Sequence, residues 1–341
     1  MDPFSQGILG ASASQLVSNR REKLEAAGVG FFAGLAADID VLFRSSVDPL
    51  LFLEYHRHFT HALIFIPVGA LFCAWVYIGL RRLLKRGADH PLPFSRIYLF
   101  ALSGYATHAI LDACTTYGTQ LFLPFSNMRV AWNNVSVVDP LFTIPLTALL
   151  VIAIVKRSDL IARIAACFAL SYLVLGLVQQ HRAADVAKDL AQSRGHVPQG
   201  LGLKPSFANI VVWKSVYQHE GRYYVDAIRV GRTHKTYQGV STQILSVKNQ
   251  FPWLDSNSQQ AKDIDRFRWF SNDHLGVDPD NPSRIIDVRY SLLPNRLDGM
   301  WGIVLDPQAD ISTHVKFDTS RPEGDALREQ TTRLWSMILG Q

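Results

Sequence analysis

Apolar residues are distributed unevenly along this chain, and that distribution limits what it can fold into more than any other feature. They concentrate before about Gln180, in runs that approach the length of a membrane-crossing helix, such as residues 62–80 and 97–113. A crossing takes about 20 mostly apolar residues. We therefore expect membrane-spanning helices in the first half of the chain and a soluble domain in the second.

The apolar runs cover residues 3–18, 28–43, 62–80, 97–113, 140–155 and 160–177. The first run is short for a crossing, and it could instead form a short helix that packs closely through Gly7, Gly10 and Ala11. The composition, 48% hydrophobic and 18% charged, is typical of a protein with a membrane-embedded part. We predict an α-helical, polytopic membrane domain with four or five spans over residues 1–181.

Basic residues gather in three of the loops between these runs, and they predict an orientation. Because positive loops stay in the cytoplasm, the acids and histidines at the opposite ends of the runs all fall on the outer side of the membrane. Much of the net charge of +5 belongs to these loops, so we expect no nucleic-acid partner. The loop residues are Arg20, Arg21, Lys23, Arg81, Arg82, Lys85, Arg86, Arg96, Lys156, Arg157 and Arg163.

The remainder of the chain predicts a small α+β domain over residues 182–341, which five spans before it would place outside the cytoplasm. An amphipathic helical linker over 181–194 is expected to break at Val197-Pro-Gln-Gly-Leu-Gly202. A turn at Gln218-His-Glu-Gly221 is expected to join two strands in a hairpin. Strands are predicted at 209–216, 222–230, 285–291 and 302–305, and helices at 261–270 and 324–339.

Two smaller features bear on location. The chain begins with an acid, Asp2, where a secretory signal carries basic residues, so we expect its start to remain in the mature protein. The cysteines, Cys73, Cys114 and Cys167, are far apart and predict no disulfide framework. The cysteine-free tail is compatible with the periplasm.

Three groups of acids and histidines lie at the ends of the apolar runs. They are Asp38-Ile-Asp40, His56-Arg-His-Phe-Thr-His61 and His108-Ala-Ile-Leu-Asp112. Ionisable residues in membrane segments are costly, and each is therefore a candidate for function. His108 and Asp112 are four residues apart on an expected helix and share a face, as two metal ligands or as a buried hydrogen-bonded pair.

The spacing in the other two groups leaves alternatives open. Asp38 and Asp40 point apart on a regular helix, so both serve one site only if the helix ends or loosens there; otherwise one of them caps or orients a neighbour. His58 and His61 share a face if a helix begins near Phe59, and they could also be interfacial histidines.

Imidazole and carboxylate ligands suit zinc, and also manganese or iron. The candidate ligands are more than one structural zinc requires, so we expect two or more ions. Two adjacent metals stabilise both the entering and the leaving oxygen in phosphoester cleavage. The ligand candidates are Asp38, Asp40, His56, His58, His61, His108 and Asp112.

Residues near the ligands are candidates for catalysis and substrate binding. Arg57 could hold a phosphate oxygen, or extend to a lipid headgroup. Asp139, at the outer start of the next run, is a possible ligand or base. The polar and aromatic segment 115–126 could roof the site and select substrate through Thr115, Tyr117 and Gln120, or it could be an interfacial loop.

These motifs together resemble the predicted inner-membrane, metal-dependent hydrolases of the YdjM type. The family is similar, at a distance, to zinc-dependent phospholipases C and single-strand nucleases, which share the His-x-x-x-Asp pattern. The resemblance implies a multi-metal phosphoesterase on a scaffold in the bacterial inner membrane. The matching stretches, within about residues 1–157, are Met1-Asp-Pro-Phe-Ser-Gln-Gly7, Ala37-Asp-Ile-Asp40, His56-Arg-His-Phe-Thr-His61, His108-Ala-Ile-Leu-Asp112, Thr115-Thr-Tyr-Gly-Thr-Gln120 and Val138-Asp-Pro140.

Two positions depart from the family's pattern. Many relatives have Thr-His near the start, where this chain has Ser5-Gln6. Since glutamine is a poor metal ligand, either one metal is missing or another residue replaces the histidine. The second motif commonly reads His-Arg-Gly, and here His58 takes the place of the glycine.

The sequence thus predicts a membrane-bound, metal-dependent hydrolase with its site at the outer leaflet. The expected substrate is a phosphoester of a lipid or lipid-linked molecule, because the site would open at the level of the headgroups. A non-enzymatic metal transporter or sensor is the alternative, since buried histidines and acids also mark ion pathways. A third possibility is a membrane anchor for the C-terminal domain.

Overall fold

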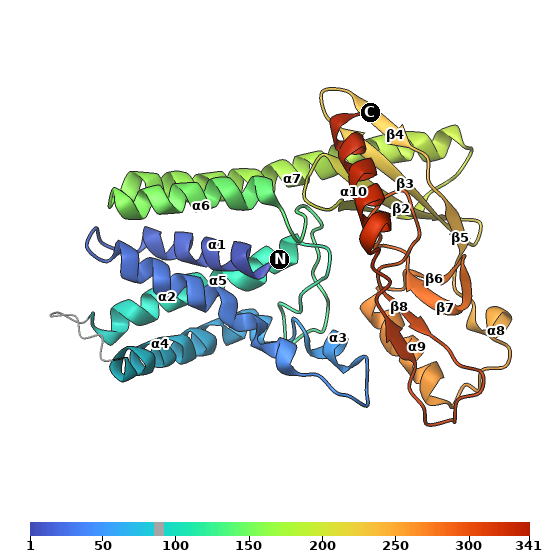
Figure 1. Ribbon diagram of the computed structural model, residues 1–341, viewed down its shortest axis with the longest axis horizontal. Helices are drawn as coiled ribbons and strands as arrows, with labels where there is room; N and C mark the ends of the chain where they lie inside the picture. Colours follow the sequence, from blue (N-terminus) through green and yellow to red (C-terminus); the bar gives the residue numbers. More distant parts are fainter. Residues whose placement is uncertain (85–91) are drawn as a thin grey trace. The chain divides into compact units, whose positions relative to one another are not determined.

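The computed structural model describes residues 1–84 and 92–341, so Lys85 and Arg86 of the predicted cytoplasmic loop lie outside the described residues. The chain forms two compact units (Figure 1). The first contains Met1–Leu42 and Tyr55–Leu177, and the second contains Phe43–Glu54 and Val178–Gln341. The boundary predicted at residues 181/182 falls inside a helix, α7 (Asp159–Ser193).

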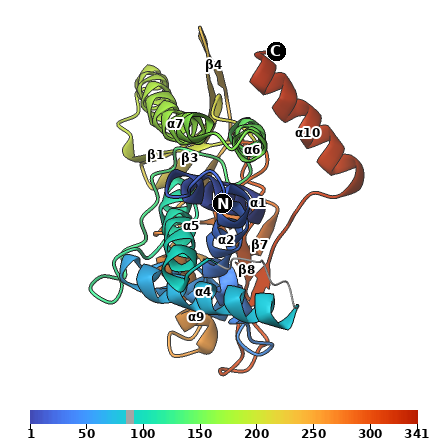
Figure 2. The same ribbon diagram turned by 90° about the vertical axis from the view of Figure 1, so that its left-hand side faces the viewer.

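The first unit is helical. Its helix α1 packs against α2, α5 and α6 (Figure 2). Its elements are α1 (Pro3–Leu16), α2 (Lys23–Leu35), the 3-10 helices η1 (Ala36–Leu42), η2 (Phe59–His61) and η3 (Leu63–Phe65), then α4 (Ile66–Leu83), α5 (Phe94–Cys114), α6 (Pro140–Val155) and the first half of α7.

Among the described residues, three helices are long and apolar enough to cross a membrane: Leu63–Leu83, Phe94–Cys114 and Asp159–Ser193. Pro140–Val155 is apolar but shorter. The predicted helical first half with candidate membrane spans is confirmed, while the predicted four or five spans and their orientation remain predictions. Residues 181–193 are helical, as predicted, but they do not form a separate linker helix, because they continue α7, which ends at Ser193 before Gly195, whose φ is +75°.

Glycines bring α1, α2 and α5 into close contact. A Cβ at Gly30 of α2 would lie 2.1 Å from Ser14 Oγ of α1, and one at Gly104 of α5 would lie 2.4 Å from the Gly30 carbonyl oxygen. Small residues allow helix backbones in membranes to approach in this way. The predicted close packing of the first helix is therefore confirmed, and it places the end of α2 beside α5.

The second unit holds two antiparallel sheets together with helices, in agreement with the predicted α+β domain. The first has the order β1-β2-β3-β4, and β5 also pairs with β3. The predicted hairpin is confirmed: Glu220 and Gly221 both have positive φ, which suits a two-residue turn between β2 and β3. The strands are β1 (Gln199–Pro205), β2 (Val212–His219), β3 (Arg222–Val230), β4 (His234–Tyr237) and β5 (Ser241–Gln243).

The second sheet has the order β6-β7-β8-β9. The helices predicted at 261–270 and 324–339 are confirmed, and the strand predicted at 285–291 begins and ends earlier, as β7. The break expected at 197–202 is confirmed, since α7 has ended at Ser193 and β1 begins at Gln199 and pairs with β2. The remaining elements are α3 (Leu51–Tyr55), α8 (Val247–Gln250), α9 (Gln259–Phe270), β6 (Leu275–Asp278), β7 (Asn281–Asp287), β8 (Gly302–Val304), β9 (Lys316–Asp318) and α10 (Gly324–Leu339).

Candidate metal centre

Four candidate ligands come together from three elements of the first unit. The α-helix α2 ends at Leu35 and continues as the 3-10 helix η1, which carries Asp38. His61 ends the short helix η2, and His108 and Asp112 lie one turn apart near the end of α5. The α-helix thus changes to a 3-10 helix before Asp38. This change is the loosening that the sequence required if Asp38 and Asp40 were both to serve one site.

The ligand atoms face one another at nearly equal distances. Asp38 Oδ1 lies 3.5 Å from His61 Nε2 and 3.4 Å from His108 Nε2. Asp112 Oδ2 lies 3.3 and 3.5 Å from the same two nitrogens. Four of the six distances within the group therefore fall between 3.3 and 3.5 Å.

Three of these atoms are buried without a hydrogen-bond partner in the described part of the chain: His61 Nε2, His108 Nε2 and Asp112 Oδ2. Their residues are 0% exposed. Burying unpaired polar atoms is costly, so native proteins seldom leave them without a partner. Three such atoms that converge on one point indicate a site for a bound group.

The spacing fits a metal ion. In a regular tetrahedron an edge is about 1.63 times the distance from centre to corner, so these edges correspond to an ion about 2.0–2.1 Å from each atom, the range of Zn–N and Zn–O bonds. Two imidazoles and two carboxylates also match the ligand types that zinc, manganese and iron accept. The residues present therefore fit a divalent metal.

Hydrogen bonds to the other ring nitrogens orient both histidines. His108 Nδ1 lies 2.6 Å from the Gly34 carbonyl oxygen, which can only accept, so this nitrogen carries a proton and leaves Nε2 free to bind a metal. His61 Nδ1 lies 3.1 Å from Asp40 Oδ2. Carbonyl or carboxylate partners of this kind are usual behind metal-binding histidines.

Asp40 organises the layer behind the cluster. Its Oδ2 accepts from the Arg57 backbone N–H at 2.8 Å and from the Thr60 hydroxyl at 2.9 Å, and its Oδ1 lies 2.9 Å from His56 Nδ1. Asp38, Asp40 and His56 also form a second group whose atoms could hold a metal. Asp40 thus orients His61, as one alternative from the sequence proposed.

The carboxylates change the protonation of His61 when no metal is bound. Burial opposes a charged imidazole, but the neighbouring carboxylates of Asp112, Asp38 and Asp40, which accept from its N–H groups, outweigh it and raise the pKa of His61 to about 10. The pocket therefore favours positive charge at its centre.

Comparison with known proteins shows the family to which the chain belongs. The family model described as "YdjM inner membrane protein" matches residues 1–183, which include all four candidate ligands. The chain belongs to this family. A Bacillus subtilis (strain 168) relative, "Uncharacterized protein YfhP", is 30% identical over 105 residues, which are 31% of this chain and 29% of that protein. The match thus covers less than a third of the relative's length. No solved structure matches the chain significantly.

The arginine of the second family motif is buried beside the cluster. Arg57 Nε lies 2.9 Å from Asp112 Oδ2, and Nη1 donates to the Thr115 hydroxyl at 2.9 Å. Its backbone has a φ of +63°. The alternative in which Arg57 extends to a lipid headgroup is wrong, because the residue is 4% exposed and its charge pairs inside the unit.

The three predicted substrate-binding residues surround Arg57. The Thr115 hydroxyl also donates to the Asp112 carbonyl oxygen, and the Tyr117 ring centroid lies 4.8 Å from the guanidinium carbon. The Gln120 backbone N–H donates to the Arg57 carbonyl oxygen at 3.1 Å. The Gln120 side-chain nitrogen is buried without a hydrogen-bond partner among the described residues. Substrate binding by this loop remains a prediction.

Two predicted residues have other surroundings. Asp139 caps α6 through the Leu141 N–H and accepts from the Tyr172 hydroxyl at 2.8 Å. The His58 ring packs beside Phe59, 6.0 Å between centroids. Neither belongs to a group of possible metal ligands among the described residues.

Gln6, where the resemblance led us to expect a histidine, contacts one of the candidate ligands. Gln6 Nε2 donates to Asp112 Oδ1 at 2.8 Å and to the His108 carbonyl oxygen at 3.3 Å. The amino group of Met1 contacts the same carboxylate oxygen. Gln6 thus fixes Asp112, while its own Oε1 is buried without a hydrogen-bond partner in the described structure. Sequence reasoning singled out Gln6, but not as a residue that holds a ligand.

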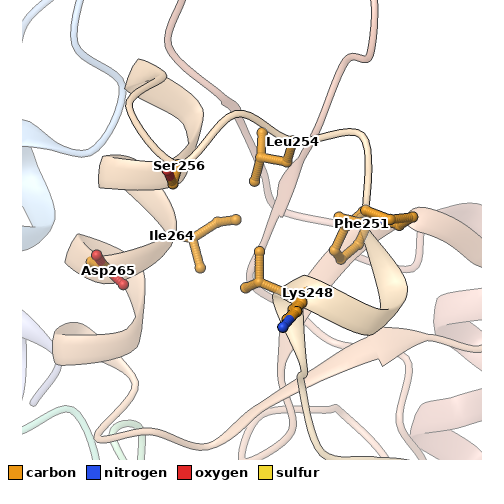
Figure 3. Close-up of a pocket in the computed structure, with 9 residues that line it drawn as sticks. Lys248, Phe251, Leu254, Ser256, Ile264 and Asp265 are labelled. Carbon is orange, nitrogen blue, oxygen red and sulfur yellow. The ribbon is translucent and has the colours of Figure 1, made fainter.

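The second unit has a cavity of about 600 Å³ between α8 and α9, shown in Figure 3. Phe251, Leu254 and Ile264 contribute apolar lining, and its ionisable lining residues are Lys248 and Asp265. This lining offers no group of metal ligands. Among the described residues, both groups of side chains that could hold a metal ion lie in the first unit.

Proposed function

We propose that this membrane-integral protein is a metal-dependent hydrolase that cleaves a phosphoester of a lipid or lipid-linked substrate. The observation that carries the proposal is the convergence of Asp38, His61, His108 and Asp112 on one point with metal-ligand spacing. A divalent ion held there would supply a Lewis acid for a phosphoryl oxygen. Zinc fits the ligands best, with manganese as a second choice.

The chain's own residues would prepare the site in two ways. Asp40 and the Gly34 carbonyl orient the two imidazoles, and Gln6 and Arg57 hold the Asp112 carboxylate. Arg57 is already tied to Asp112 and Thr115, so its first role is to position that ligand. A phosphate oxygen would have to share its guanidinium.

The substrate class and location are inferred from the position of the ligands at the ends of apolar helices. A site at such a level favours a lipid-borne phosphoester over a soluble one. The loop charges place this level at the outer leaflet, with the C-terminal domain in the periplasm. Membership of an inner-membrane protein family supports the membrane but not the side.

The test uses purified full-length protein in vesicles of phosphatidylethanolamine and phosphatidylglycerol, loaded with zinc or manganese. Release of phosphorylated headgroup or of phosphate is measured for wild type, for His108→Ala, and for His234→Ala as a control with an exposed histidine in β4. We expect activity that His108→Ala abolishes and His234→Ala keeps. Metal binding without hydrolysis of these lipids, combined with zinc flux into the vesicles, would replace the hydrolase with a transporter.

A further inference from the structure

The segment Phe43–Glu54 divides the metal centre along the chain. It follows Asp38 and Asp40 and precedes His56 and His61, yet it folds with the second unit. We call this segment the strap. Its two ends lead to neighbouring atoms, because His56 Nδ1 lies 2.9 Å from Asp40 Oδ1. Whatever fixes the strap therefore restrains both segments that carry the ligands.

One arginine of α9 holds the strap. Arg266 Nη1 and Nη2 lie 2.9 and 2.8 Å from the two carboxylate oxygens of Asp48, and Nε lies 2.5 Å from Glu54 Oε1. Nη1 also donates to Asp263 Oδ1 at 2.9 Å. Bidentate, charge-assisted pairs are among the strongest hydrogen bonds in proteins, and the Arg266 side chain is only 21% exposed.

Apolar contacts complete the attachment of the strap to the second unit. Leu50 and Leu53 are buried, and the ring of Phe52 packs edge-on against Phe317 of β9 with centroids 5.4 Å apart. Asp48 also accepts from the Leu50 N–H at 3.0 Å, just before α3 begins. The strap is thus a docked element with a defined conformation.

We propose that Arg266 is a positioning residue for the metal centre. By docking the strap it fixes the separation of Asp40 from His56, and through Asp40 the orientation of His61, whose Nδ1 lies 3.1 Å from Asp40 Oδ2. This inference rests on the metal site of the proposed function, and it does not depend on hydrolysis. The coupling is reciprocal: a docked strap raises metal affinity by the factor by which metal stabilises docking.

The experiment compares full-length Arg266→Gln with Arg268→Gln in detergent. Arg268 is a matched control because it lies on the same helix and pairs with Asp273, outside the strap. The zinc dissociation constant is measured by competition with a chromophoric chelator. We expect Arg266→Gln to raise it about tenfold, within the range seen when groups behind metal ligands are removed, and Arg268→Gln to leave it unchanged.

A second variant and a second measurement keep the test decisive. Arg266→Gln also removes one partner of Asp263, so Asp48→Asn/Glu54→Gln, which changes only the strap, should weaken zinc binding equally. Hydrogen exchange of residues 36–42 and 55–61 is measured in metal-free protein, where we expect faster exchange in both strap-releasing proteins than in Arg268→Gln. Equal affinity and equal exchange across all variants would overturn the inference. Absence of zinc binding in wild type would refute the metal site, and exchange would still decide the role of Arg266.

Discussion

Two clusters of acids and histidines in this chain neutralise buried charge in different ways. Around Arg266, both oxygens of Asp263 are fully paired: Oδ1 accepts from Arg266 and Gln259, and Oδ2 interacts with His314 and the Val315 N–H. In the metal centre, Arg57 pairs with Asp112, yet His61 Nε2 and His108 Nε2 are buried without a hydrogen-bond partner among the described residues. A cluster of ionisable groups therefore indicates a bound ion where buried ligand atoms are left without a hydrogen-bond partner.

The largest effect should come from removing both imidazoles of the metal centre. We expect His61→Ala/His108→Ala to lose the metal that wild type retains through purification, because two of four ligands disappear and the remaining carboxylates cannot hold the ion. Elemental analysis of detergent-purified protein measures this directly.

The matched control takes histidines from the other region. His219→Ala/His314→Ala removes two imidazoles from the second unit, one of them from the paired cluster. It should keep the full metal content. Two outcomes would contradict the distinction between the two clusters. One is loss of metal in this control, and the other is a wild type that binds no metal after reconstitution with zinc.

A smaller effect is expected from Asp40→Asn, which changes a residue behind the ligands. The amide cannot match the carboxylate as an acceptor for His61 Nδ1 and His56 Nδ1. Residues behind metal ligands typically contribute about 10- to 100-fold to affinity. The zinc dissociation constant should rise within that range, with the wild-type metal content still reached at saturation. Complete loss of binding would instead make Asp40 a direct ligand.

Lys214 extends the comparison to a buried cation that has no acid among its hydrogen-bond partners. Its Nζ donates to the Ser291 hydroxyl and the Arg296 carbonyl oxygen, both at 2.8 Å. Burial lowers the pKa of Lys214 to about 7. In the unfolded chain the lysine stays protonated up to its ordinary pKa, so between these values the unfolded state binds more protons and stability rises with pH.

The free energy of unfolding should rise by about 1.4 kcal/mol per pH unit between roughly pH 7 and 10. The urea midpoint of the full-length protein, followed by tryptophan fluorescence, should therefore increase over this range. Lys214→Met should reduce the increase, whereas Lys235→Met, at an exposed position of β4, should not. Parallel pH profiles for the three proteins would contradict a neutral Lys214.

The smallest effect on metal is predicted for Asp139→Asn. The carboxylate caps α6 and accepts from Tyr172, so the change should cost about 1 kcal/mol of stability through a weakened cap and hydrogen bond. Metal content and affinity should not change. A loss of metal comparable to that of His61→Ala/His108→Ala would restore Asp139 as a ligand.

Much of the fold could be predicted because hydropathy and turn chemistry act locally. The apolar runs became helices α4, α5 and α6, and the turn at Glu220 and Gly221 formed its hairpin. The full length of α7 was missed because a change from apolar to amphipathic sequence suggested a boundary where the backbone has none. Short strands such as β4 and β9 carry too few residues for a pattern to show.

The candidate site was predictable in part. His108 and Asp112 share a helix face by spacing alone, and the structure gives them His61 as a neighbour. That Asp38 faces the cluster while Asp40 stands behind it depends on the 3-10 turn of η1. A pattern of side chains cannot predict that the Gly34 carbonyl oxygen accepts from His108. It also cannot predict that the strap docks on the second unit.

The strap also makes the site divisible. A single cut after the exposed Arg44 would leave Asp38 on one polypeptide and His61, His108 and Asp112 on another. Packing of α1 and α2 against α5 would keep the two fragments together, and a bound metal would add a bridge between them. A nick at this point would therefore make the metal a link between two polypeptides, where in the intact protein it links segments of one.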